Sequence, residues 1–316
     1  MLKDLLRTAD LTAGDLALLL ELSADLKARP HAEETLLRNE VVGVYFNKPS
    51  TRTRLSVAAA VARLGGVPQI LGPGDLQLGR GETIEDTAAV MSRYLKAFVI
   101  RTYADDDVAT FAAASAIPVV NALTDGHHPC QSLADLLTIR ERFGTLEGVR
   151  VAYLGDGNNV THSLVEAGAL AGMQMIVATP SGYDPDTQIM ADATRLAGVH
   201  GGSVELVRDP VEAVTGAHAV YTDVWLSMGD PEEERERRLA DLDAYRVTEE
   251  LMAHARDDAV FLHCLPAHRG EEVTREVMDG WRSLVFDQAE NRLCTVQALL
   301  VALIQGRLEG AGRQDR

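Results

Sequence analysis

The chain has 316 residues, of which 46% are hydrophobic and 24% are charged. That composition is ordinary for a folded protein and excludes wholesale disorder, and the length is typical of two domains rather than one. Thirty lysines and arginines against 47 aspartates and glutamates give a net charge of −17, which argues against a nucleic-acid partner because phosphate backbones are bound by basic surfaces.

Further features of the chain predict where the protein works. No apolar run approaches the roughly 20 residues that span a bilayer, and the first residues, MLKD, lack the basic and apolar regions of a signal peptide. The three cysteines, Cys130, Cys264 and Cys294, form no CxxC motif and cannot all pair with one another, as is typical of a reducing compartment. We therefore expect a cytoplasmic protein with no membrane partner.

The predicted elements begin with a helix, for which Thr12 is a suitable N-cap with Asp15 three residues later. Short apolar runs then alternate with amphipathic helical segments. The predicted strands are 41–46, 97–100, 118–121, 151–154, 175–178, 204–207, 219–222, 260–262 and 284–286, and the predicted helices include 55–64, 132–143, 163–171, 185–197 and about 295–306. Continuous apolar strands that alternate with helices indicate parallel sheets covered on both faces.

The expected fold class is therefore α/β, with two domains that each hold a mostly parallel sheet flanked by helices. We expect the first domain to comprise residues 1–135 and the second residues 148–291. The stretch 133–148 is the predicted crossing between them, and the C-terminal helix, about 292–316, is expected to pack back on the first domain. Ligands of open parallel sheets bind beyond the carboxyl ends of the strands, so the loops after the strands should carry the site.

The loop after the first predicted strand has the composition of an anion cradle. Residues 47–54, NKPSTRTR, place the hydroxyls of Ser50, Thr51 and Thr53 at a helix start, together with the fixed positive charge of Arg52. A helix N-terminus itself attracts phosphate. The alternative is an ordinary capped helix with surface arginines, and the lack of a GxxxxGK[ST] pattern argues against a P-loop.

Other strand ends in the first half, and one near the end of the chain, suit an anionic or carbonyl substrate. Arg101 follows one predicted strand, the loop 126–131, GHHPCQ, follows the next, and Arg292 follows the last. His128 and Gln131 can hydrogen-bond a carbonyl or an amide group. A structural role for either histidine of this loop stays open.

The loop 155–160, GDGNNV, begins like a dinucleotide fingerprint. Valine replaces its third glycine, however, and the next strand ends without an acidic residue, so a nicotinamide site is disfavoured. Asparagines such as Asn159 are better interpreted as amides that face a polar substrate.

Asp223, at another strand end, is suited to hold an ammonium group.

The segment 263–268, HCLPAH, places Cys264 between histidines. Such a pair suggests either a zinc site or a nucleophile. Zinc requires a fourth donor at a suitable spacing, and none is evident in the sequence. We therefore predict no metal site.

Together these segments resemble those of a known family, the aspartate/ornithine carbamoyltransferases. STRTR at 50–54 and HPCQ at 128–131 are similar to the family's carbamoyl phosphate motifs, and DVWLSMG at 223–229 and HCLP at 263–266 are similar to motifs of its ornithine branch. The resemblance implies an enzyme that transfers the carbamoyl group of carbamoyl phosphate to the δ-amine of L-ornithine, which yields L-citrulline and phosphate in arginine metabolism. It implies no cofactor.

The resemblance also assigns residues to each substrate. Carbamoyl phosphate is implied to bind Ser50, Thr51, Arg52, Thr53, Gln77, Arg101, His128, Gln131, Cys264, Leu265 and Arg292, with Gln77 reaching the site of a neighbouring subunit. Ornithine is implied to bind Asn159, Asp223, Ser227 and Met228. The residues implied to act in catalysis are Cys264, Arg101, His128 and Asp223. The family forms trimers, so a homotrimer or a multiple of trimers is expected.

Three alternative functions stay open. A relative with another amine acceptor, such as putrescine or an acylated ornithine, is disfavoured because Asp223 and the SMG segment provide for an α-amino group. A relative that binds carbamoyl phosphate without catalysis is disfavoured because the set of motifs is complete. A dehydrogenase is disfavoured by the incomplete dinucleotide fingerprint.

Overall fold

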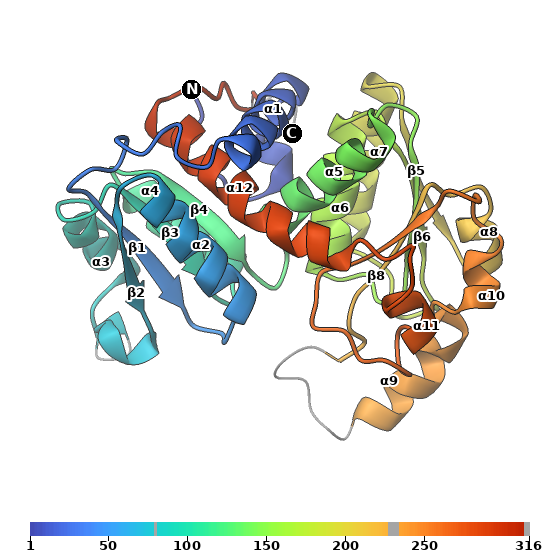
Figure 1. Ribbon diagram of the computed structural model, residues 1–316. Coiled ribbons are helices and arrows are strands. Elements are labelled where there is room, and N and C mark those ends of the chain that lie inside the picture. The colour runs from blue at the N-terminus through green and yellow to red at the C-terminus, as the bar shows by residue number, and fades with distance from the viewer. Residues whose placement is uncertain (79–80, 227–233, 313–316) are drawn as a thin grey trace. The chain divides into compact units, whose positions relative to one another are not determined.

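The computed structural model describes residues 1–78, 81–226 and 234–312 (Figure 1). The chain divides into two compact units, one formed by Met1–Leu137 with Glu290–Arg316 and the other by Thr138–Ala289. Each unit contains a parallel sheet flanked by helices, which confirms the predicted fold class. In the described ranges, no helix has the length and apolar character needed to cross a membrane.

The first unit contains a four-stranded sheet with the strand order β2-β1-β3-β4. Its strands are β1 (Val41–Phe46), β2 (Val67–Leu71), β3 (Ala97–Arg101) and β4 (Val119–Leu123), and all neighbouring pairs are parallel. The central strands bury β-branched and aromatic side chains, among them Val44 and Phe98, which suit a pleated surface covered on both faces. Phe98 stacks on Phe111 with ring centroids 4.6 Å apart, which joins the sheet to a helix.

Helices cover both faces of this sheet. They are η1 (Thr8–Asp10), α1 (Ala13–Ala28), α2 (Thr51–Arg63), η2 (Pro73–Asp75), α3 (Ile84–Met91) and α4 (Asp105–Ala114), with parts of α5 (Pro129–Phe143) and α12 (Val285–Ile304). Because β2 and β3 lie on opposite sides of β1, right-handed crossovers put α2 on one face and α3 and α4 on the other (Figure 1). α1 begins at the predicted capping box, in which Thr12 and Asp15 exchange hydrogen bonds of 3.0 and 2.9 Å.

The second unit contains a five-stranded parallel sheet with the order β7-β6-β5-β8-β9. Its strands are β5 (Arg150–Leu154), β6 (Gln174–Ala178), β7 (Ser203–Val207), β8 (Ala219–Thr222) and β9 (Val260–His263). Its helices are α6 (Asn159–Leu170), α7 (Thr187–Val199), α8 (Pro210–Val214), α9 (Arg235–Leu242), η5 (Asp243–Tyr245), α10 (Glu249–Met252) and α11 (Arg275–Met278).

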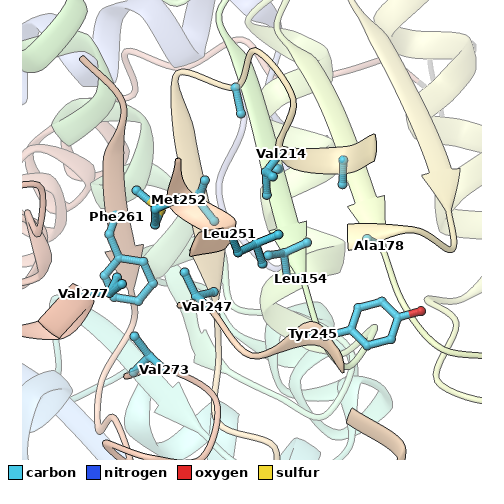
Figure 2. Packing of buried hydrophobic residues seen from close by; sticks show 14 of the residues in the cluster. Leu154, Ala178, Val214, Tyr245, Val247, Leu251, Met252, Phe261, Val273 and Val277 are labelled. Carbon is cyan, nitrogen blue, oxygen red and sulfur yellow. The ribbon is translucent and has the colours of Figure 1, made fainter. Parts of the chain in front are cut away.

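A hydrophobic cluster stabilises the short elements of the second unit (Figure 2). Leu154 and Phe261 from the sheet pack with Leu251 of α10, Val277 of α11 and Val273 just before α11. Full burial of each large side chain contributes about 1.5–3 kcal/mol. Helices as short as α10 and α11 are not stable alone, so this packing is what holds them.

Two strand predictions need correction. β2 is missing from the predicted strands because it contains Pro68 and, as an edge strand, leaves Val67 more than half exposed; proline is tolerated at such edges. The strand predicted over 284–286 is wrong, because α12 begins at Val285. Three apolar residues cannot distinguish a strand from a first helical turn, and the chain makes only an isolated bridge to Phe261 before the helix begins.

Each sheet contains one point at which the order of its strands reverses. In the first sheet, the chain moves from β1 to β2 on one side and returns to β3 on the other. In the second sheet, it moves from β5 through β6 to β7 and returns to β8 on the other side of β5. Loops diverge at such reversals and leave a crevice at the carboxyl ends of the strands, so the β1/β3 and β5/β8 ends are the expected binding positions.

Candidate active site

The β1/β3 end of the first sheet carries the segment that the sequence predicts to be an anion cradle. Ser50 is the N-cap of α2, and its Oγ accepts the N–H of Thr53 at 3.3 Å. Asn47 N–H donates to the carbonyl of Arg101 at 2.8 Å, which ties the end of β3 to the loop that enters α2. Thr51 and Arg52 form the first turn of that helix, so hydroxyls, guanidinium groups and the helix N-terminus meet at one edge of the sheet.

Arg292 is the centre of a buried polar group in the first unit. From α12, its guanidinium donates to Thr53 Oγ1 at 2.7 Å and to Gln131 Oε1 at 2.8 Å, and it lies 3.4 Å from His128 Nε2. All four residues are at most 3% exposed. Gln131 in turn donates to Asp135 at 2.7 Å. Four predicted site residues from three helices and a loop are thus brought together.

The electrostatics of this group keep His128 neutral. Burial, followed by the positive charges of Arg292, Arg101 and Arg52, holds the pKa of His128 well below its usual value. A neutral imidazole has one N–H to donate and one nitrogen to accept. The group therefore concentrates arginine charge without adding a protonated histidine, which suits an anionic substrate with a polar carbonyl.

Asp105, which the sequence analysis does not single out, holds the loop before His128. Its carboxylate accepts from Thr124 Oγ1 at 2.6 Å and from the N–H of Gly126 at 3.0 Å, and lies 2.8 Å from His127 Nδ1. Burial alone would raise the pKa of Asp105, but the hydrogen bonds from His127 and Thr124 outweigh it and lower that pKa. No local pattern reveals this clamp, because its partners lie about 20 residues away.

Replacing Asp105 with asparagine is expected to lower the free energy of unfolding at pH 7 by about 1 kcal/mol. Hydrogen bonds to a charged group contribute more than this when buried, but the Asp105 side chain is 41% exposed, which reduces the effect. Urea unfolding would measure it, with Asp106→Asn in the same helical turn as the control. Because the folded pKa lies below 3.8, the difference should persist near pH 5 and shrink only as the pH falls through that folded pKa; no difference at pH 7 would contradict the clamp.

The other carbamoyl phosphate residues predicted from the sequence lie elsewhere. Gln77 is exposed, on the loop between η2 and α3, unlike the buried residues around Arg292. Cys264 and Leu265 belong to the second unit. A cavity of about 850 Å³ lies beside the cradle, and its lining includes Ser50, Thr51 and Asp75.

The β5/β8 end of the second sheet carries a carboxylate, an amide and a thiol. Leu154 pairs with Thr222 and Thr222 pairs with His263, so the residues that follow these strand ends meet. Asp223 accepts from Asn158 Nδ2 at 3.0 Å and from Cys264 Sγ at 2.8 Å. Asp223 is 7% exposed, and a buried carboxylate of this kind suits a cationic ligand.

Hydrogen bonds to Gln288 and His263 hold the backbone of the loop that carries Cys264. His263 N–H donates to Gln288 Oε1 at 3.0 Å, and Leu265 N–H donates to His263 Nδ1 at 2.9 Å. Leu265 has a positive φ of 61°, a conformation that costs a non-glycine residue energy and persists only where its surroundings impose it. The two hydrogen bonds hold the backbone on either side of Cys264, and the thiol itself donates to Asp223.

Asn158, which the sequence analysis passed over in favour of Asn159, is the residue that contacts Asp223. It is the N-cap of α6, where its Oδ1 accepts the N–H groups of Val160 and Thr161. Capping aims its amide nitrogen at Asp223, and its place before a helical pattern was the available signal. Asn159 is the first residue of α6 and is half-buried.

Two predicted ornithine residues, Ser227 and Met228, lie outside the described residues. Nearby, the Tyr153 phenol donates to the carbonyl of Asp156 at 3.0 Å. Burial and the negative charge of Asp223 hold the pKa of Tyr153 well above its usual value, so Tyr153 stays protonated.

Asp223, His263 and Cys264 together carry donor atoms that a metal ion could bind. Ligand atoms of Asp223, His263 and Cys264 lie within 4.8 Å of one another. Their donor types suit zinc, but His263 Nδ1 already accepts Leu265 N–H and the thiol already donates to Asp223. A metal ion here would compete with a cationic ligand for the same groups.

The fold is that of a two-unit α/β protein, with arginines around a helix start at the end of one sheet and a buried carboxylate at the end of the other. Family models place a domain boundary close to Leu137, although the second model extends through most of α12. Residues 3–141 match the carbamoyl-P binding domain, and residues 147–303 the Asp/Orn binding domain, of aspartate/ornithine carbamoyltransferase. The chain belongs to the aspartate/ornithine carbamoyltransferase family.

Individual relatives cover nearly the whole chain. It is 52% identical over 304 residues to the ornithine carbamoyltransferase of Acidothermus cellulolyticus, with 96% of this chain and 97% of that protein covered. The crystal structure of ornithine carbamoyltransferase from Thermus thermophilus is similar with a TM-score of 0.87 and 42% identity, over 96% of this chain and 99% of that one. The enzyme from Pyrococcus furiosus has a TM-score of 0.92 and 48% identity, over 97% and 98% of the two chains.

Proposed function

We propose that the protein transfers the carbamoyl group of carbamoyl phosphate to the δ-amine of L-ornithine, giving L-citrulline and phosphate. The chain is a carbamoyltransferase by its family. The observation that carries the choice of acceptor is the Asp223 carboxylate, buried at a strand end and hydrogen-bonded to Asn158 and Cys264. A buried carboxylate favours an acceptor with an ammonium group, as ornithine has.

Carbamoyl phosphate is proposed to bind within residues 1–135, with help from the C-terminal segment 292–316. Arg52, Arg101 and the start of α2 would hold the phosphate group and neutralise the charge that it gains on leaving. Thr53, His128 and Arg292 would donate to the carbamoyl oxygen as it becomes an oxyanion. The burial of these residues and the three contacts of Arg292 support this assignment, since a preorganised donor in a dry site is typically worth about 10²–10³ in rate.

Ornithine is proposed to bind within residues 148–291. Asp223 and Asn159 would hold its α-amino end, with Ser227 and Met228 contributing from the segment that follows β8, and Cys264 would lie beside the δ-amine. That amine must attack as the free base, although a lysine-like amine has a pKa of about 10.4 in water. Its nitrogen then bonds to the carbamoyl carbon while the carbon–oxygen bond to phosphate breaks and the amine releases one proton.

Citrulline formation tests the proposed function. Carbamoyl phosphate would be supplied with L-ornithine, and in parallel with putrescine, N-acetylornithine or aspartate. Turnover with ornithine alone is expected. Turnover with another acceptor would contradict the assignment of the SMG segment at 227–229, with Asp223, to the α-amino end of ornithine. No turnover with any acceptor would leave a protein that only binds carbamoyl phosphate.

Iodoacetamide is expected to alkylate Cys264 before Cys130 or Cys294. The thiolate is the reactive form, and burial raises the pKa of Cys130 to about 11, while Cys294 is 2% exposed. Peptide mass spectrometry would give the order of labelling, and ornithine turnover should fall with the labelling of Cys264.

No covalent intermediate is needed in this reaction, so Cys264 should never carry the carbamoyl group. Rapid quenching with ¹³C-labelled carbamoyl phosphate, followed by mass analysis of the Cys264 peptide, would test that. A carbamoylated Cys264 that appears and decays at the turnover rate would contradict direct transfer.

A homotrimer, or a multiple of trimers, is the proposed assembly, with a cytoplasmic location. The exposed side chain of Leu55 and the cavity beside Ser50 and Thr51 support a subunit contact there, because apolar side chains that gather at a surface hollow favour protein association. Gln77 would reach the site of the neighbouring subunit. Light scattering is expected to give a particle of three chains or a multiple of three, and a monomer with full activity would contradict the proposal.

A further inference from the structure

A cluster of two carboxylates and an imidazole lies in the segment that follows the Cys264 loop. Ligand atoms of His268, Glu271 and Glu272 lie within 4.8 Å of one another. The backbone of the segment is held by hydrogen bonds of 2.9 Å, from Glu271 N–H to the carbonyl of His268 and from Val247 N–H to the carbonyl of Glu272. Val273, next in the chain, belongs to the hydrophobic cluster of Figure 2, so the three side chains project from a fixed turn.

Glu272 is the unusual member of the cluster. Its side chain is fully buried, and within the described ranges no hydrogen-bond donor reaches its Oε2 atom. The other oxygen, Oε1, accepts the N–H of His268 and lies 3.3 Å from His263 Nε2. A buried carboxylate oxygen without a hydrogen-bond donor costs free energy of folding. This oxygen lies 3.7 Å from His268 Nδ1, so it is on the side of Glu272 that faces the other members of the cluster.

We propose that His268, Glu271 and Glu272 form a binding site for a divalent transition-metal ion of the zinc class. One imidazole nitrogen and two carboxylate oxygens are a donor set that suits Zn²⁺ and leaves a fourth position for water. Bonds of about 2.1 Å in a tetrahedral site separate ligand atoms by roughly 3.4 Å, close to the 3.7 Å that already separates His268 Nδ1 from Glu272 Oε2. Magnesium is excluded by the imidazole ligand and by its need for oxygen donors.

The accessibility of the ligands fits a site that exchanges its ion. His268 is 45% exposed, whereas Glu272 is buried, so an ion can enter from solvent and meet a buried charge. Glu271 forms an ion pair with Arg235, which the metal would share or displace. This site has no residue in common with the Asp223, His263 and Cys264 group.

Binding of a metal ion at this site would affect the Cys264 loop through one carboxylate, that of Glu272. Glu272 faces His263 Nε2, and His263 Nδ1 accepts the N–H of Leu265. An ion that binds Glu272 would therefore draw that carboxylate away from its 3.3 Å contact with His263 Nε2. This regulatory consequence rests on the proposed function, whereas the metal site itself does not.

Calorimetric titration with ZnCl₂ tests the site without using activity. Cys264→Ser in the full-length chain removes the thiol of the other candidate group. It is expected to bind one zinc ion per chain. Adding His268→Ala to Cys264→Ser should weaken zinc binding at least tenfold. Adding Glu271→Gln instead should also weaken it.

The matched control is Cys264→Ser with His254→Ala, which removes another exposed histidine of the same unit and should leave zinc affinity within twofold. Circular dichroism would verify that each variant is folded. Equal zinc affinity with and without His268, or no zinc binding to Cys264→Ser at 1:1 stoichiometry, would overturn the proposal. No citrulline formation by the unsubstituted protein, with zinc binding to Cys264→Ser intact, would contradict the proposed function instead.

Discussion

Replacing Arg292 with lysine is expected to lower kcat/KM for carbamoyl phosphate about 10³-fold, which corresponds to about 4 kcal/mol of lost transition-state stabilisation. Arginine presents a rigid planar fork, and here that fork donates to Thr53 and Gln131 from two different nitrogens. The lysine ammonium keeps the charge but cannot make both contacts in the same geometry. The loss of kcat/KM should therefore come from the changed hydrogen-bond geometry around residue 292 and not from a change of charge.

Steady-state kinetics of citrulline formation would give the effect of Arg292→Lys. Arg307→Lys, an exposed arginine beyond the end of α12, is the matched control and should stay within twofold of the unsubstituted protein. The alkylation rate of Cys264 should be unchanged, because Cys264 belongs to the other unit. A loss smaller than tenfold would show that Arg292 does not act on the reacting carbamoyl group.

Replacing Asp223 with asparagine is expected to lower kcat/KM for ornithine about 10²–10³-fold, or some 3–4 kcal/mol, while KM for carbamoyl phosphate stays within about twofold. Asparagine has nearly the same shape and its carbonyl can still accept the Cys264 thiol proton, although the hydrogen bond from Asn158 Nδ2 is lost. What is lost is the buried negative charge that would face an ammonium group.

The two-substrate kinetics separate this role from a structural one. Asp257→Asn, an exposed aspartate of the same unit, should behave like the unsubstituted protein toward both substrates. If Asp223→Asn impaired carbamoyl phosphate and ornithine equally, the carboxylate would be supporting the whole second unit rather than binding the acceptor. Normal use of ornithine would contradict the assignment altogether.

The order of the strands determines where the residues proposed to bind carbamoyl phosphate and those proposed to bind ornithine lie. Asp223 and Cys264 meet because Thr222 and His263 are partners in adjacent parallel strands, and Arg101 reaches the cradle because Arg101 pairs with Phe46. Parallel strands align their carboxyl ends on one edge, and the reversal of strand order opens that edge to ligands. Substitutions of Phe46 or Thr222 that weaken this strand pairing should therefore disturb binding without replacing a proposed ligand residue.

The sequence by itself determined the chemistry of the strand ends. Apolar runs located eight of the nine strands of the described residues. The Thr12 cap and the hydroxyls at 50–53 marked two helix starts, and Asp223 and Cys264 stood out as polar residues directly after buried strands. These signals are local, because a strand, a cap or a helix start depends on residues within one or two turns of each other. Local signals also misled: the three apolar residues at 284–286 resembled a strand, and Pro68 concealed β2.

Only the tertiary structure decided which of these residues act together. Arg292 lies 239 positions from Thr53 in the chain and still donates to it, and Asn158 reaches Asp223 across 65 positions. The clamp of Asp105 and the buried Glu272 have no sequence pattern of their own. Hydrophobic periodicity specifies which face of an element is buried, but not which element it is buried against, and partners so distant are chosen by strand order and helix packing.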